Sequence, residues 1–135
     1  QRHCDALNLQ NHVTLLGAVS AETVKQKLLT AHIFALASWH EPLGVAYMEA
    51  MACGVPTIAT NSGGVPELIT DGENGLMVPP KDPAALADAI ERIARDSDLA
   101  HHLSTTGRDY VVANCASRLG AETLKREVQR LGHPE

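Results

Sequence analysis

Two carboxylates, Glu41 and Glu49, lie within one short stretch of the sequence, "HEPLGVAYMEAMACGVPTIAT" at residues 40–60. Glu49 belongs to an apolar segment with helical spacing, and no residue three or four positions away from it is basic. Such a carboxylate faces solvent, finds a partner elsewhere in the fold, or accepts hydrogen bonds from a ligand. A ribose suits the last alternative, because its 2′- and 3′-hydroxyls can both donate to one carboxylate.

Glu41 stands directly before Pro42, which favours extended backbone and places Glu41 just outside the helix. An acid at this position can simply complement the helix dipole. The neighbouring Leu43 and Gly44 suggest a second interpretation, because a glycine lets backbone N–H groups come close to a ligand at the positive end of a helix. An anionic phosphate joined to a sugar would fit such a corner.

A second glycine-containing loop, "SGGVPE", repeats this arrangement with Gly63 and Gly64 before a short helix that begins near Val65. A Gly-Gly pair is by itself most often a turn. Backbone N–H groups in such a loop can also form a concavity that binds anions. Two loops of this kind, each before a helix N-terminus, together favour an anionic, hydroxyl-rich ligand.

The order of predicted elements places both loops at one edge of a sheet. Strands are predicted at 11–17, 32–38, 56–60 and 76–80, and helices at 20–31, 43–53 and 65–70. Ser20 is expected to cap the first helix, and Gly54 and Pro56 to end the second. Three further helices are predicted at 82–96, 97–115 and 116–132. This alternation predicts an α/β fold with a mostly parallel sheet, whose ligands bind beyond the carboxyl ends of the strands, here the loops at 38–44 and 60–66.

Composition narrows the class of protein. The 135 residues suit one domain or part of one, and the 44% hydrophobic content with only four aromatic residues predicts a core of small aliphatic side chains. A net charge of −5 without a basic cluster disfavours nucleic-acid binding. The cysteines Cys4, Cys53 and Cys115 form no CxxC pair and no metal-ligand spacing, which favours free thiols in a reducing compartment. Without a signal peptide or a span of ~20 apolar residues, a cytoplasmic protein is expected.

Four blocks resemble the donor-binding half of family-4 (group 1) glycosyltransferases, the retaining enzymes of GT-B fold. They are the Glu-x7-Glu pattern of Glu41 and Glu49, "EAMACGVPTIAT", "GGVPE" and "GLMVP", in this order within about 60 residues. The resemblance covers nearly the whole chain. It implies a Rossmann-like sheet that is part of a truncated half of the GT-B fold, with an α/β part over 1–81 and terminal helices over 82–135.

The resemblance also implies roles for individual residues. Glu41 would hold the hydroxyls of the donor sugar and position its anomeric carbon, as the catalytic-site residue, and Glu49 would bind the ribose of the nucleotide. The segment formed by Pro42, Leu43 and Gly44 would present backbone N–H groups to sugar and phosphate. The wall beside them would be shaped by Gly63 and Gly64. No metal and no cofactor is expected, because helix ends and protein cations stabilise the leaving diphosphate in such enzymes.

Some parts of the family pattern are not in this sequence. The amino-terminal acceptor domain is missing, as is the start of the donor domain with the Arg and Lys that neutralise the diphosphate. The sheet also lacks the strands that the family places between those at 11–17 and 32–38. The 135-residue chain is therefore expected to bind a nucleotide-sugar donor without transferring the sugar alone, and its open sheet edges can pair with a second copy. The full enzyme would be a hexosyltransferase of polysaccharide biosynthesis with peripheral membrane association.

Two other functions remain open from the sequence. One is a non-catalytic nucleotide-binding or interaction module that keeps a remnant of the fold. The other is an epimerase of related GT-B fold, against which the Glu-x7-Glu context argues.

Overall fold

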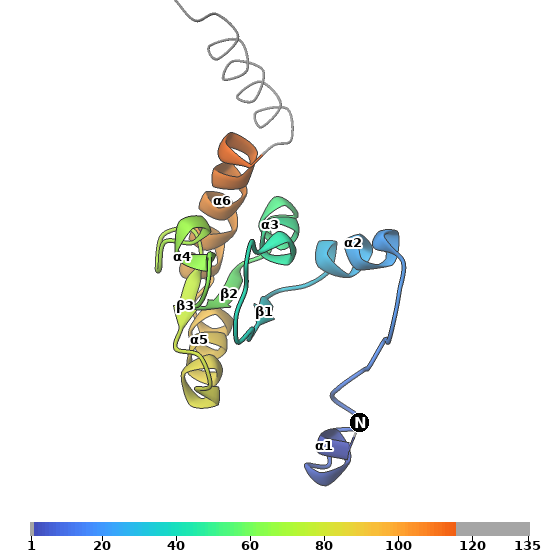
Figure 1. Ribbon diagram of the computed structural model, residues 1–135. Coiled ribbons are helices and arrows are strands. Elements are labelled where there is room, and N and C mark those ends of the chain that lie inside the picture. Colours follow the sequence, from blue (N-terminus) through green and yellow to red (C-terminus); the bar gives the residue numbers. More distant parts are fainter. Residues whose placement is uncertain (1, 116–135) are drawn as a thin grey trace, which may run out of the picture.

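The computed structural model describes residues 2–115, which form a parallel three-stranded sheet with flanking helices (Figure 1). The strands are β1 (Phe34–Leu36), β2 (Thr57–Thr60) and β3 (Leu76–Val78). Their order in the sheet is β1-β2-β3, and Phe34 pairs with Thr57 while Ile58 pairs with Leu76. The helices are α1 (Arg2–Ala6), α2 (Ala21–Leu29), α3 (Val45–Ala52), α4 (Val65–Leu68), α5 (Pro83–Arg95) and α6 (Ser97–Asn114). The helix predicted at 116–132 lies outside the described residues.

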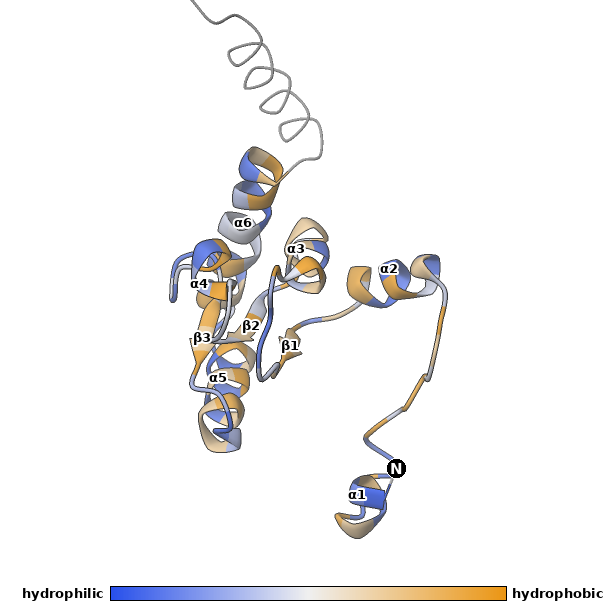
Figure 2. Ribbon diagram, viewed as in Figure 1, coloured by the Kyte–Doolittle hydropathy of each residue, from blue (hydrophilic) through white to orange (hydrophobic). Residues whose placement is uncertain are grey.

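The sheet confirms the predicted α/β class and three of the predicted strands. All four residues of β2 are buried, as expected of a central strand covered on both faces. Figure 2 shows β3 in orange and β2 partly so, whereas α5 alternates between orange and blue, as expected of a helix with one face on the sheet. Because the strands are parallel, their carboxyl ends share one edge, from which the loops at 38–44 and 60–66 leave.

The strand predicted at 11–17 is wrong. These residues are exposed and form turns and irregular backbone, and α1, which the sequence did not predict, precedes them. The sequence does have the apolar, β-branched character of a strand, and this link between α1 and α2 is partly orange in Figure 2. A strand also needs a hydrogen-bonded neighbour, and no strand among residues 2–115 lies beside this one.

The helices begin where short polar side chains cap them. The Ser20 hydroxyl accepts the Thr23 N–H at 3.2 Å at the start of α2, as predicted. Asp82 and Asp96 cap α5 and α6 in the same way, with carboxylate oxygens 2.9 Å from the Ala85 and Leu99 nitrogens respectively. These bonds satisfy N–H groups that have no partner within their own helix.

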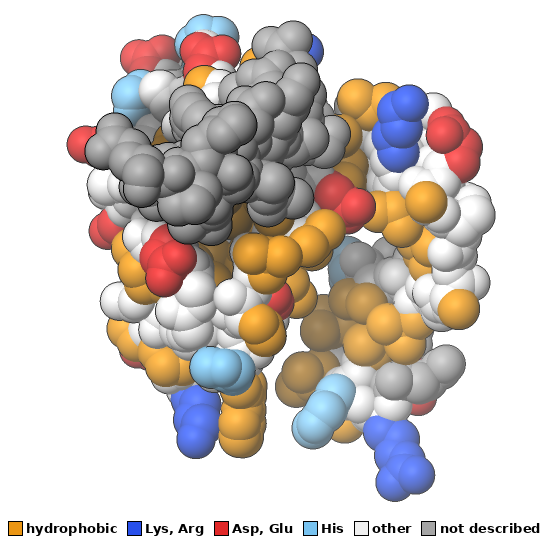
Figure 3. Space-filling model, turned by 45° about the horizontal axis from the view of Figure 1, so that its top comes forward, with side chains coloured by type: hydrophobic (Ala, Val, Ile, Leu, Met, Phe, Trp, Pro, Cys, Tyr) orange, Lys and Arg blue, Asp and Glu red, His pale blue; other side chains and the backbone are white. Residues whose placement is uncertain are grey.

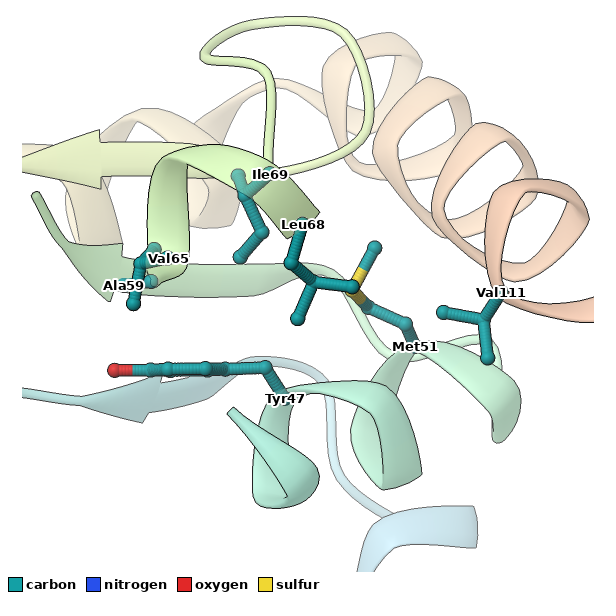
Figure 4. Packing of buried hydrophobic residues seen from close by; sticks show 7 residues of the cluster. All are labelled: Tyr47, Met51, Ala59, Val65, Leu68, Ile69 and Val111. Atoms are coloured by element: carbon teal, nitrogen blue, oxygen red, sulfur yellow. The ribbon is translucent and has the colours of Figure 1, made fainter. Parts of the chain in front are cut away.

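The main core lies between α3 and the elements that cover it. Figure 4 shows Tyr47 extending from α3 toward the side of Ala59 and Val65, and Met51 lying between Leu68 of α4 and Val111 of α6. Tyr47 is fully buried, and its ring meets Phe34 edge-on with the centroids 6.1 Å apart. The core therefore holds α3, which carries Glu49 and follows Glu41, against the sheet.

A single side-chain hydrogen bond ties α6 to the end of α3. The half-buried Ser104 hydroxyl donates to the Gly54 carbonyl oxygen at 2.6 Å. We expect Ser104→Ala to lower the free energy of unfolding by about 1 kcal/mol, because the carbonyl loses its partner. Urea denaturation measures this, and Ser97→Ala, at an exposed position of the same helix, is the control with an expected change below about 0.5 kcal/mol. Equal losses in both variants would contradict the assignment.

The helices and the cysteines can be compared with what the composition predicts. None of the helices within residues 2–115 is long and apolar enough to span a bilayer. All three cysteines of the sequence are free and partly buried.

Candidate functional site

The loops that follow β1 and β2 are joined at the carboxyl edge of the sheet. The Thr60 hydroxyl donates to the Ser38 carbonyl oxygen at 2.8 Å, and the Gly64 N–H donates to the Glu41 carbonyl oxygen at 2.9 Å. Tyr47 adds a third link, because its hydroxyl donates to the Leu36 carbonyl oxygen at 2.8 Å. These bonds fix the backbone on both sides of Glu41.

Positions 63 and 64 require glycine, because the backbones of the two loops touch there and leave no room for a side chain. Gly63 has a φ of +58°, and a Cβ built there would overlap the Glu41 carbonyl oxygen. A Cβ on Gly64 would lie 2.5 Å from the Pro42 carbonyl oxygen. Both glycines therefore form a wall directly against the segment that the sequence singled out.

The Glu41 carboxylate is held in place by two donors. Its Oε1 accepts the Gly44 N–H at 3.0 Å, and its Oε2 accepts a longer hydrogen bond of 3.4 Å from the Ser38 hydroxyl. Glu41 is half-buried, so part of the carboxylate still faces solvent. Each oxygen keeps a further lone pair, which allows the group to accept a hydrogen bond from a ligand hydroxyl.

The expected set of backbone donors at Pro42, Leu43 and Gly44 needs correction. Proline has no N–H, and the Gly44 N–H is already bound by the Glu41 carboxylate. Only the Leu43 N–H of this segment has no acceptor within residues 2–115.

The first turn of α3 supplies further donors. Its N-cap, Gly44, has a φ of +79° and no side chain that caps the helix. The N–H groups of Val45 and Ala46 have no acceptor among the described residues. Together with the helix dipole they make this end of α3 attractive to an anion.

Glu49 lies apart from the loops, in a pocket between α2 and α3. The pocket measures about 450 Å³, and Glu49 borders it together with Val19, Val24, Ala52 and Cys53. Glu49 is exposed and takes part in no ion pair or side-chain hydrogen bond within the described part of the chain. Figure 3 shows hydrophobic side chains on both sides of the hollow between the segment with α1 and α2 and the rest of the molecule.

The predicted site residues thus fall into two groups. Glu41, Pro42, Gly44, Gly63 and Gly64 meet at the paired loops, whereas Glu49 lies farther along α3. Leu43 is 65% exposed and borders a smaller recess of about 200 Å³ beside α6.

Cys115 also borders that recess, and burial raises the pKa of its thiol, which stays protonated at neutral pH.

Sequence reasoning missed the residues that hold the loops. Ser38, Tyr47 and Thr60 donate the hydrogen bonds around Glu41, but each also fits an ordinary strand end or helix. The one available signal was Tyr47, because a buried tyrosine usually needs a partner for its hydroxyl.

The fold is that of one part of the GT-B glycosyltransferases, as comparison with solved structures shows. Sucrose-phosphate synthase from Thermosynechococcus elongatus matches with a TM-score of 0.89 and 35% identity, over 96% of this chain and 33% of that one. Anabaena HepE in complex with UDP-glucose matches with a TM-score of 0.78 and 28% identity, over 93% of this chain and 35% of that one.

Among curated relatives, the 2-deoxystreptamine N-acetyl-D-glucosaminyltransferase of Niallia circulans is 36% identical over 108 residues, which cover 80% of this chain and 28% of the relative. The model of the family described as glycosyl transferases group 1 matches residues 1–110. The chain belongs to this family. It spans about 26–28% of the length of the first relatives it matches.

Proposed function

We propose that the chain is the nucleotide-sugar-binding part of a retaining family-4 hexosyltransferase, with a glycan, lipid or small molecule as acceptor. The observation that carries this is Glu49, a carboxylate with no ion-pair partner within residues 2–115, in a pocket of about 450 Å³ whose other lining residues are mostly apolar. Pockets of about 300–1,000 Å³ are typical of small-molecule sites. Apolar walls suit the flat face of a base, and the carboxylate suits the two hydroxyls of a ribose.

The rest of the donor follows along α3 toward its N-terminus. The N–H groups of Leu43, Val45 and Ala46, which have no acceptor in the described part of the chain, would receive the diphosphate, where the helix dipole favours negative charge. Beyond them, the Glu41 carboxylate would accept hydrogen bonds from the sugar hydroxyls and hold the anomeric carbon for transfer with retention. In this proposal the donor needs neither a metal nor another cofactor.

Support also comes from proteins of the same fold. The HepE structure that this chain resembles was solved with UDP-glucose, at 28% identity. A nucleoside diphosphate joined to a sugar is the ligand that the two groups of site residues fit.

The measurement that tests this proposal is a titration of the 135-residue chain with UDP, GDP and ADP, followed by NMR chemical shifts. At least one nucleotide should shift the amide signals of Glu49 and Gly64 in a saturable way. Absence of binding at millimolar nucleotide would contradict the donor site.

A second candidate function is a non-catalytic nucleotide-binding module, and the lack of basic side chains on the two loops supports it. No Lys or Arg lies on the loops at 38–44 and 60–66, so no side-chain cation there neutralises a diphosphate. Under either candidate we propose that the isolated chain binds nucleotide without transferring sugar. In the leading candidate an acceptor domain of the longer enzyme would complete the site, whereas a non-catalytic module would bind nucleotide only. Donor turnover by the purified chain would overturn this.

The outer edge of β1 is a place where another strand could add to the sheet. Within residues 2–115, β1 pairs with β2 alone, and Val13, Leu15 and Leu16, in the segment before α2, are exposed. Strands of the longer enzyme or of a second copy would cover this edge. Peripheral membrane association and a cytoplasmic location are proposed for the enzyme as a whole.

A further inference from the structure

An exposed tryptophan and a lysine form a pair at the carboxyl edge of the sheet. Trp39, in the loop after β1, is 75% exposed, and the Lys81 Nζ lies 4.4 Å from the centroid of its ring. Lys81 comes after β3, so the sheet brings together residues far apart in the sequence. The pair has no part in the core, and Lys81 forms no ion pair within the described residues.

The pair stands at the rim of a recess of about 220 Å³. Ala37, Thr60 and Val78, at or just beyond the ends of the three strands, line the recess, with Leu86 of α5. Its lining includes none of the proposed donor-binding residues. In parallel α/β sheets ligands bind at this edge, so a recess here is a candidate for a second ligand.

The position of the pair relative to the donor indicates which ligand this is. The proposed donor runs from Glu49, at the ribose, along α3 to Glu41, at the transferred sugar. Trp39 lies two residues before Glu41 and lines a recess different from the Glu49 pocket. A molecule over Trp39 would therefore lie at the sugar end of the proposed donor, where an acceptor must approach.

The chemistry of the two side chains defines the class of acceptor. The exposed face of an indole offers a flat apolar surface for the C–H groups of a sugar ring. The Lys81 ammonium, held by its attraction to the ring, still has donors to give to an anion. The neighbouring Asp82 carboxylate does not compete fully for it, because it accepts the Ala85 N–H as the cap of α5.

We propose that Trp39 and Lys81 form an acceptor subsite for a sugar that carries an anionic group. This inference rests on the proposed donor-binding function, because the donor path is what makes the subsite an acceptor subsite. Trp39 would stack on the sugar ring, and Lys81 would select the anionic substituent.

Trp39 is the single tryptophan of the chain, so its fluorescence reports directly on the subsite. We would titrate the 135-residue chain with glucose 6-phosphate, glucose and inorganic phosphate. Glucose 6-phosphate should change the Trp39 emission in a saturable way, with an affinity about tenfold above that of glucose. Inorganic phosphate, which lacks the ring, should leave the emission unchanged.

Variants of Lys81 distinguish the loss of its charge from a loss of the folded structure. Lys81→Gln should lower the affinity for glucose 6-phosphate about tenfold, to that for glucose, whereas Lys81→Arg should keep most of the affinity. Lys27→Gln, at an exposed lysine of α2, is the control and should leave the affinity for glucose 6-phosphate unchanged. Circular dichroism checks that each variant is folded. The subsite proposal is overturned if glucose 6-phosphate gives no response, if glucose binds equally well, or if Lys81→Gln binds as the parent does. A separate UDP titration shows whether the donor site has failed instead.

Discussion

Gly63→Ala should lower the free energy of unfolding by about 3 kcal/mol and loosen the loop that holds Glu41. Two effects add. A left-handed φ of +58° costs an L-residue about 1–2 kcal/mol relative to glycine. The new methyl group would also overlap the Glu41 carbonyl oxygen, and such overpacking costs about 1–3 kcal/mol. Urea or thermal denaturation measures the sum.

Gly72→Ala is the matched control for the backbone effect. Gly72 also has a positive φ, of +77°, but a Cβ there would meet no atom within 4 Å. This variant should therefore lose only the conformational part, about 1–2 kcal/mol. If both variants lose the same stability, the contact between Gly63 and the Glu41 segment is less tight than the structure has it.

If the proposed donor site is correct, the same contact keeps the site ready for a ligand. The paired loops fix the Glu41 backbone through the Gly64 N–H, and the Gly44 N–H and the Ser38 hydroxyl orient its carboxylate. A carboxylate that is already oriented loses little freedom when a sugar binds. In the proposed function the glycines would thus serve the site through their close packing against the Glu41 segment rather than through contact with the ligand.

Sequence reasoning predicted the parts of the fold that depend on local signals. The strands around Phe34 and Ile58, the Ser20 cap and the end of α3 near Gly54 all follow from apolar runs, capping side chains and turn residues. The apolar run at 32–38 predicts a strand buried on both faces, whereas Phe34 and Leu36 are half-buried and Ala35 is exposed, because β1 has a neighbouring strand on one side only within residues 2–115. The place of the two loops followed in turn, because parallel strands put their carboxyl ends on one edge.

Other features depend on partners that a local pattern does not reveal. Residues 11–17 have the character of a strand, but strand formation requires a neighbour that residues 2–115 do not provide. The Gly44 N–H was expected to be free for a ligand, whereas the nearby Glu41 carboxylate binds it. The close approach of Gly64 to Pro42 depends on the tertiary fold in the same way.

Glu49→Gln should weaken nucleotide binding about 30-fold, the second large effect that we expect. The amide keeps one acceptor oxygen but loses the charge, and in the proposed arrangement its NH2 group would face a ribose hydroxyl that needs an acceptor. Hydrogen bonds to a charged group contribute about 1.5–3 kcal/mol, and 2 kcal/mol corresponds to about 30-fold in Kd. Because Glu49 is exposed, the substitution should leave stability within about 0.5 kcal/mol of the parent.

Comparison with Glu41→Gln tests the division of roles along α3. UDP carries no sugar beyond its diphosphate, so the Glu41 variant should lose less than about threefold in affinity for UDP. Glu73→Gln, at an exposed glutamate away from both pockets, controls for the change in net charge. Isothermal titration calorimetry with the best-binding nucleotide measures all three. Equal losses for Glu49→Gln and Glu41→Gln would mean that the ribose does not lie at Glu49, and the direction of the donor along α3 would have to be reversed or abandoned.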